Sequence, residues 1–129
     1  MATVELTKDN FEEVISNNDM VIVDFWASWC GPCKTFAPVF EATSEKYPDI
    51  VFGKVNTEEQ MELAGAFDIR SIPTLMMVRE KVILYAKPGA VPAHSLEGLL
   101  DRMMAVDMNQ VRDEIANAQA EESGSGSTG

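Results

Sequence analysis

The sequence predicts an α/β domain built on βαβ units, because short apolar runs alternate with stretches of helical periodicity along most of the chain. The run Met20 to Ala27 is nearly continuous in apolar residues, which is typical of a central strand buried on both faces. The chain has 129 residues, of which 46% are hydrophobic and 24% charged. That is enough for one domain whose core needs no disulfide or metal for support.

The first half of the chain is expected to supply two strands and two helices. Apolar side chains at i, i+3 and i+4 indicate a helix, a threonine before such a run caps it, and Pro32 suits a first helical turn, where its missing N–H costs nothing. In chain order we expect a strand at Val4–Leu6, a helix capped by Thr7 with Phe11, Val14 and Ile15 on one face, the strand Met20–Ala27, and a helix at Gly31–Tyr47.

The second half is expected to supply a further strand, a short helix, a hairpin and a longer helix. The segment between the hairpin strands, Arg79-Glu80-Lys81, lacks the Asn-Gly or Asp-Gly of a tight turn, so its register stays open. In order we expect a strand at Ile50–Asn56, a helix at Glu59–Ala66, hairpin strands at Thr74–Val78 and Val82–Ala86, and a helix with Leu96, Leu99, Leu100, Met103 and Met104 on its apolar face.

A helix with a thin apolar stripe follows the domain, which we place at residues 1–106. Asp107 is positioned to cap it, and the stripe consists of Met108, Val111, Ile115 and Ala118. We assign this amphipathic helix to residues 107–121 and a flexible Ser/Gly tail, native or added, to 122–129. The helix is expected to fold back on its own domain, and the alternative is a docking helix for a partner.

Charge and hydropathy exclude several classes of function. A formal net charge of −11 argues against binding to nucleic acid or to an anionic membrane, because phosphate groups are held by clustered Lys and Arg. The apolar runs are all shorter than the roughly 20 residues that cross a bilayer. The N-terminus shows no signal-like pattern, so we expect a reducing, cytoplasmic location. We also expect a monomer.

Two cysteines, Cys30 and Cys33, are the only ones in the chain, and they could form a structural disulfide, half of a metal site or a redox pair. A core of this size needs no disulfide to support it. A zinc site needs about four ligands, and the only histidine, His94, is far away in the sequence. The redox interpretation is therefore favoured, and no metal or bound cofactor is expected.

The position of Cys30 at the end of a buried strand and the start of a helix suits a nucleophile. Unpaired N–H groups and the positive end of the helix dipole favour its thiolate over its thiol. Gly31 and Pro32 place Cys33 one turn further into the helix, where it can resolve a mixed disulfide formed by Cys30. Cys33 must lose a proton for that step. Asp24, a carboxyl group in the adjacent buried strand, is a suitable acceptor.

Three segments together resemble the thioredoxin family: VDFWASWCGPCK at residues 23–34, RSIPTL at 70–75 and PGA at 88–90. Their order and spacing match over about residues 4–105. A Cys-x-x-C pair alone is weak evidence, whereas these three segments together are specific. The resemblance implies a thioredoxin fold, with a central mixed β-sheet of about five strands flanked by helices on both faces.

The resemblance also implies roles for individual residues. It assigns Cys30 as the nucleophile, Cys33 as the resolving cysteine and Asp24 as the proton acceptor. It makes Lys54 the buried charge partner of Asp24, and Pro73 a cis-proline packed against the disulfide. The apolar surface that receives client proteins would consist of Trp29, Gly31, Pro32, Ile72, Gly89 and Ala90. Trp26 is expected to be an ordinary core residue.

Two positions depart from the family pattern. Glu80-Lys81 replaces a turn that usually contains glycine, at a hairpin expected to lie far from the cysteines. Pro88 stands where the family often has a β-branched residue before Gly-Ala, which puts in doubt which client proteins bind.

The function that follows is a protein-disulfide reductase that cycles between dithiol and disulfide. The resemblance implies that a thioredoxin reductase, a flavoprotein, recharges it with electrons from NADPH, and that its partners are disulfide-containing client proteins. One alternative is a co-chaperone or adaptor that grips clients through the domain and its last helix. Another is a disulfide oxidase or isomerase, which the Gly-Pro between the cysteines and the expected compartment both disfavour.

Overall fold

The computed structural model describes residues 2–128, and side chains up to Glu122. Five strands form one mixed sheet with the spatial order β1-β3-β2-β4-β5. The three strands β1, β3 and β2 pair in parallel, whereas β4 and β5 are antiparallel to their neighbours. The strands are β1 (Thr3–Glu5), β2 (Met20–Trp26), β3 (Val51–Asn56), β4 (Thr74–Arg79) and β5 (Val82–Pro88).

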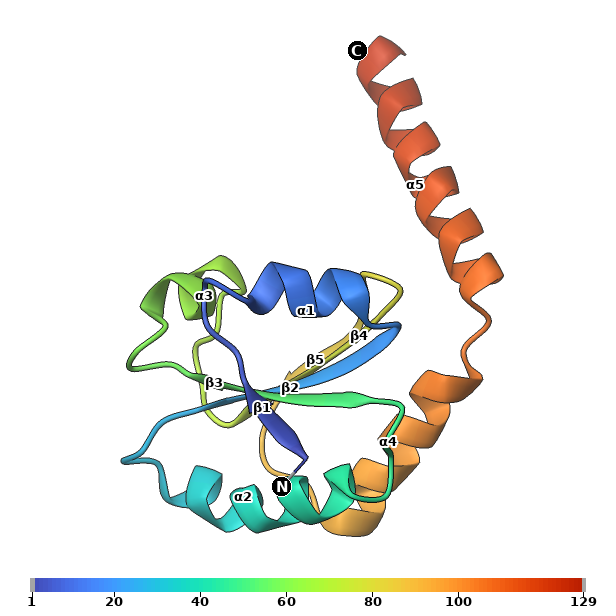
Figure 1. Ribbon diagram of the computed structural model, residues 1–129. Coiled ribbons are helices and arrows are strands. Elements are labelled where there is room, and N and C mark those ends of the chain that lie inside the picture. Colours follow the sequence, from blue (N-terminus) through green and yellow to red (C-terminus); the bar gives the residue numbers. More distant parts are fainter. Residues whose placement is uncertain (1, 129) are drawn as a thin grey trace.

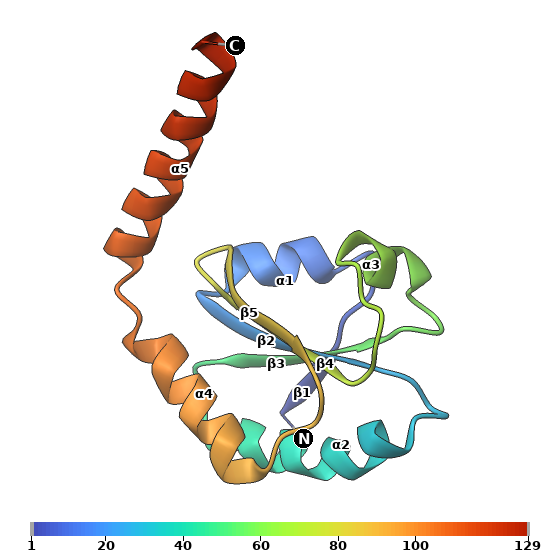
Figure 2. The same cartoon turned by 180° about the vertical axis from the view of Figure 1, so that it is seen from behind.

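Helices cover both faces of the sheet, with α1 and α3 on one face and α2 and α4 on the other (Figures 1 and 2). The helices are α1 (Phe11–Asn17), α2 (Gly31–Ser44), α3 (Met61–Ala66), α4 (Ala93–Ala105) and α5 (Met108–Thr128). The predicted α/β class and the mixed five-stranded sheet with helices on both faces are therefore confirmed. None of the helices in the part of the chain that the structure describes is long and apolar enough to span a membrane.

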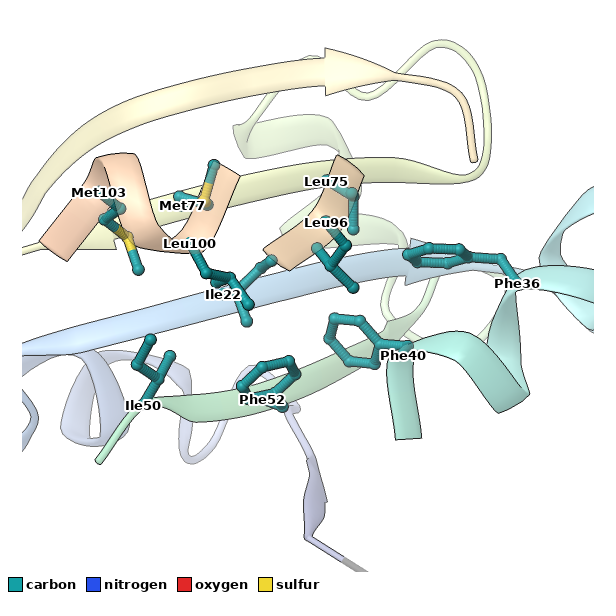
Figure 3. Packing of buried hydrophobic residues seen from close by; sticks show 10 residues of the cluster. All are labelled: Ile22, Phe36, Phe40, Ile50, Phe52, Leu75, Met77, Leu96, Leu100 and Met103. Atoms are coloured by element: carbon teal, nitrogen blue, oxygen red, sulfur yellow. The ribbon is translucent and has the colours of Figure 1, made fainter. Parts of the chain in front are cut away.

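The core has one apolar cluster on each face of the sheet, because successive side chains of β2 point to opposite faces. Figure 3 shows the cluster on the α2 and α4 face, where Ile22 of β2 meets Phe40 and Leu100. On the other face, Val23 and Phe25 pack with Phe11. The alternation places Asp24 and Ile22 on the same face, the one that α2 covers.

A glycine in β3 allows the N-terminal segment to pack closely against the sheet. A Cβ atom on Gly53 would lie 2.8 Å from Cγ of Leu6, a side chain that is fully buried. The backbone N–H of Leu6 also donates to the carbonyl oxygen of Lys54 at 2.8 Å. β1 and the residue that follows it are thereby fixed beside β3.

Helix α3 begins at Met61, two residues after the predicted start, and the start of α1 and the end of α2 also differ from the prediction. Thr7 accepts the N–H of Asp9 in a turn that precedes α1, and the helix itself begins at Phe11, so the prediction that Thr7 caps it is wrong. α2 ends at Ser44, before the predicted end at Tyr47. The residue before a proline avoids helical dihedrals, and Pro48 therefore shortens this helix.

The hairpin between β4 and β5 closes with the two residues Glu80 and Lys81, both of which have positive φ angles, 51° and 68°. A two-residue hairpin turn with both φ values positive is the type that normally selects asparagine and glycine. The register shifts by one residue between Met77 and Val78. Because the hairpin contains both a bulge and an unusual turn, the register of β4 and β5 cannot be predicted from the sequence.

The C-terminal helix α5 leaves the domain instead of folding back on it (Figures 1 and 2). Met108 at its start is buried, but Ile115 is 38% exposed and Ala118 is exposed. The expectation of a helix packed on its own domain is therefore wrong beyond the first turn. α5 also continues to Thr128, past the boundary at residue 121 that the composition suggested.

Candidate active site

The two cysteines lie at the junction of β2 and α2 and form a disulfide, with Cα atoms 5.2 Å apart. Cys30 is the N-cap residue of α2, and its Sγ accepts the N–H of Cys33 at 3.2 Å. Both side chains are buried, together with Ala27, and Ile72 packs against them. The helix start thus places a hydrogen-bond donor on the sulfur of Cys30, where it favours a negative charge once the disulfide is reduced.

The loop that contains Pro73 lies directly beside Cys30. The Ile72–Pro73 peptide bond is cis, and the carbonyl oxygen of Ile72 lies 3.7 Å from Sγ of Cys30. The N–H of Gly89 donates to the carbonyl oxygen of Pro73 at 2.8 Å, which joins this loop to the segment after β5. Gly89 has a φ of 109°, a backbone conformation that glycine adopts at little cost.

The side chains around the disulfide form an apolar rim. Trp29 is 70% exposed although it is large and apolar, and Ile72 is half-buried. Gly31, Pro32, Gly89 and Ala90 are also exposed, whereas Pro73 is buried. The structure therefore brings Trp29, Ile72, Gly31 and Pro32 to the cysteines, and Gly89 is joined to them through Pro73.

Asp24 is fully buried in the middle of β2, and neither of its carboxyl oxygens has a hydrogen-bond partner. Burial raises the pKa of Asp24 to about 7, and the positive charge of Lys54 opposes part of that rise. Such a carboxyl group exchanges protons close to neutral pH. Because Asp24 lies on the sheet face that α2 covers, it is on the same side of β2 as Cys33.

Lys54 is the residue of β3 that pairs with Asp24, but its surroundings differ from those expected. It is half-exposed instead of buried, and its Nζ lies 4.9 Å from the centroid of the Trp26 ring. This is a cation–π interaction, in which the aromatic face attracts the positive charge of the ammonium group. Trp26 is likewise half-buried and packs against the cysteine cluster, so it connects the cysteines to Lys54.

A second loop, which no pattern in the sequence indicated, supports the active site. Ser28 donates twice to Oε1 of Glu58, from its backbone N–H at 3.0 Å and from its hydroxyl at 2.7 Å. These bonds hold the pKa of Glu58 below its usual range. Thr57 donates to the carbonyl oxygen of Trp26 from both its N–H and its hydroxyl, at 2.8 and 3.0 Å. The loop after β3 thereby holds the segment that leads into Cys30.

Comparison with known proteins identifies this arrangement. The family model described as thioredoxin matches residues 2–102. The chain belongs to the thioredoxin family. It is 53% identical over 120 residues to a putative thioredoxin 2 of Streptomyces coelicolor, a match that covers 93% of this chain and 90% of that protein. It is 44% identical over 100 residues to a thioredoxin of Buchnera aphidicola subsp. Acyrthosiphon pisum, which covers 76% of this chain and 93% of the relative.

Solved thioredoxin structures agree with the fold. The structure of Plasmodium falciparum thioredoxin superposes with a TM-score of 0.72 at 35% sequence identity, over 78% of this chain and 97% of that one. Thioredoxins are protein-disulfide oxidoreductases, and this chain holds the cysteine pair at disulfide distance, so its function is that of a thiol-disulfide reductase. The family uses no bound cofactor, because the two sulfurs themselves carry the electrons.

Proposed function

We propose that the chain reduces disulfides in client proteins by dithiol-disulfide exchange at Cys30 and Cys33. The thiolate of Cys30 attacks a client disulfide, so that one Cys30-to-client S–S bond forms and the client S–S bond breaks. The thiolate of Cys33 then attacks Sγ of Cys30 and releases the client as a dithiol. The client gains two electrons, and this protein is left with the Cys30–Cys33 disulfide. The observation that carries the proposal is Cys30 at the N-cap of α2, with the N–H of Cys33 directed at its sulfur.

Asp24 accepts the proton of Cys33 in this scheme. Its burial, its unpaired oxygens and a pKa raised to about 7 support that role, because a group with such a pKa binds and releases a proton readily at neutral pH. Lys54, held over Trp26, keeps that pKa from rising further. Neither Lys54 nor Trp26 needs to contact the client.

Clients bind over the apolar rim of Trp29, Gly31, Pro32, Ile72, Gly89 and Ala90, which surrounds the sulfur of Cys30. The backbone at Ile72 borders the disulfide and is suited to pair with an extended client segment. The electron supply is NADPH through a flavoprotein thioredoxin reductase, and the working compartment is the reducing cytoplasm. Family membership supports both assignments.

A trapping experiment with single cysteine variants tests the order of the two cysteines. The Cys33→Ser variant should accumulate a mixed disulfide with a client such as insulin, because the resolving thiol is missing. The Cys30→Ser variant should accumulate little, although it retains one thiol. Equal trapping by both variants, quantified by mass spectrometry under non-reducing conditions, would contradict the assignment.

The proton acceptor is tested by stopped-flow kinetics. We expect Asp24→Asn to slow the resolution of the mixed disulfide by about 10 to 100-fold and to leave its formation nearly unchanged, because only resolution requires deprotonation of Cys33. Equal slowing of both steps would remove Asp24 from the mechanism.

A further inference from the structure

The C-terminal helix α5 carries an apolar stripe that the domain leaves uncovered. The stripe consists of Met108, Val111, Ile115 and Ala118, and only Met108 is buried. Because side chains three and four residues apart share a helix face, the stripe forms one seam along α5. Both views show α5 standing away from the sheet and its covering helices (Figures 1 and 2). An exposed seam of this kind is suited to contact another surface.

One edge of this seam is acidic. Asp107, Glu114 and Glu121 recur every seven residues, which places them along one side of the stripe. The described side chains of α5 include one cation, Arg112, and it is already paired with Glu80. The helix therefore presents an apolar stripe with negative charge along one edge.

The direction of α5 is fixed by hydrogen bonds at its base. Nη1 of Arg79 donates to the carbonyl oxygens of Met103, Met104 and Val106, at 3.0, 3.1 and 2.8 Å. Oδ1 of Asp107 accepts the N–H of Asn109 at 3.0 Å and caps the first turn of α5. Arg79 thus holds the end of α4 and Val106, and the ion pair between Arg112 and Glu80 ties the start of α5 to the hairpin between β4 and β5, so that the rest of α5 leaves the domain.

A groove of matching character lies between β5 and the C-terminal half of α4. Its volume is about 440 Å³, and apolar side chains form its floor. Two cations border it, Lys87 and Arg102, both of which are exposed. The groove is lined by Met77, Leu84, Tyr85, Lys87, Leu99, Arg102, Met103 and Val106. An apolar floor with basic residues at its edge is complementary to the acidic, apolar face of α5.

We propose that α5 docks into this groove of a second copy of the chain, so that two copies exchange their C-terminal helices about a two-fold axis. A groove that a chain's own helix does not fill can be filled by the helix of a second copy, and two such contacts related by a two-fold axis form a closed dimer. Charge complementarity sets the pairing, with Glu114 and Glu121 of one copy facing Lys87 and Arg102 of the other. The proposal departs from the monomer that we expected from the sequence.

The match to the Streptomyces coelicolor protein is consistent with a structural role for α5. That match covers 120 residues of this chain, so it must extend beyond Asp107 into the helix. The match to the Buchnera aphidicola protein covers 100 residues, about the length of the domain alone. The sequence match thus extends into the α5 region for one relative and is limited to about the length of the domain for the other.

The test is sedimentation velocity on the full chain, in oxidised form, up to about 1 mM, where even a Kd of about 100 μM gives mostly dimer. We expect reversible dimerisation. Reversing the two cations of the groove, in Lys87→Glu with Arg102→Glu, should weaken it at least about tenfold, and so should Glu114→Lys with Glu121→Lys. Combining all four substitutions should restore it, because the charges are exchanged across the interface.

A matched control separates this groove from general charge effects. Lys8→Glu with Lys81→Glu changes the net charge by the same amount but alters the cations beside a second groove, between α1 and α3. This control makes the same change in net charge without altering the proposed interface. It should therefore dimerise clearly more tightly than the Lys87 and Arg102 variant. A chain that stays monomeric at about 1 mM would overturn the proposal. The proposal would also be overturned if neither double variant weakened the dimer, or if the control weakened it to the same extent as the Lys87 and Arg102 variant. Failure of the four combined substitutions to restore dimerisation would overturn it as well.

Discussion

At the scale of single residues, the site combines a pair of cysteines with a carboxyl group, Asp24, that is costly to bury. An unpaired buried carboxylate is unfavourable, and the protein avoids the charge by raising the pKa of Asp24 to about 7. In the proposed mechanism, the same property that destabilises the fold at alkaline pH provides Cys33 with a proton acceptor near neutral pH. Stability and activity therefore oppose each other at this position.

The pH dependence of stability follows from this pKa. In the unfolded chain Asp24 ionises near its ordinary pKa of 3.8, whereas in the folded protein it retains its proton up to about pH 7. The native state thus binds more protons between these values, and the free energy of unfolding falls as pH rises from about 4 to about 7. A shift of this size corresponds to about 4 kcal/mol.

Asp24→Asn should abolish that contribution. We expect the variant to be more stable than the parent at pH 8 by up to about 4 kcal/mol, and the difference to shrink as pH falls and to vanish below about pH 3, where Asp24 is neutral in both states. Urea denaturation of both proteins across this pH range measures the difference. A difference that does not change with pH would contradict the raised pKa.

Lys54 offers a second check at the residue scale. Its positive charge lowers the pKa of Asp24 against the larger effect of burial. Removing the charge in Lys54→Met should therefore move the pKa of Asp24 upward from about 7, as measured by NMR titration of the carboxyl carbon. Lys34→Met, an exposed lysine in α2, serves as the control and should leave the titration unchanged. A downward shift in Lys54→Met would exclude the interaction.

At the scale of elements, the parts that the sequence predicted well are those that a single physical pattern determines. The near-continuous apolar run of β2 and the Pro32 that follows Cys30 indicated a buried strand leading into a helix, and the structure shows both. Asp24 stands out in the sequence as the one polar residue in that run, and the structure shows that it is buried. The support of the active-site loop by Glu58 was not predictable, since it depends on the packing of two loops distant in the sequence.

The element-scale errors arise where local and tertiary preferences compete. The position of the Lys54 side chain over the Trp26 ring depends on the pairing of β2 with β3, so it cannot be predicted from local sequence alone. The direction of α5 is set by Arg79, whose three bonds to carbonyl oxygens join β4 to the end of α4. Periodicity identifies an apolar face on α5, but it does not indicate which surface covers that face.

The hairpin turn gives an element-scale prediction. Lys81 has a φ of 68°, which costs a residue with a side chain about 1 kcal/mol relative to glycine. Lys81→Gly should therefore raise the free energy of unfolding by about 1 kcal/mol, measured by urea denaturation. The same substitution in a helix, Lys34→Gly, should lower it by about the same amount. Destabilisation by Lys81→Gly would show that the turn is not strained.

At the scale of the whole molecule, the sheet brings together segments that are far apart in the chain. β2 delivers Asp24 and the cysteines, β3 delivers Lys54, and the start of β4 places Pro73 beside Cys30. The helix start at Cys30 supplies the hydrogen bond to its sulfur, and the surrounding apolar rim is open to clients. The fold thus brings together at one end of the molecule the groups to which the proposed mechanism assigns the roles of nucleophile, resolving thiol, proton acceptor and docking surface.

The most direct measurement is insulin disulfide reduction, coupled to NADPH through a bacterial-type thioredoxin reductase. The account predicts rapid turnover by the parent chain and its loss in Cys30→Ser, with circular dichroism showing that the variant is folded. A folded parent chain whose two thiols react with a thiol reagent but give no turnover would contradict reductase function. It would favour a module that binds clients without reducing them.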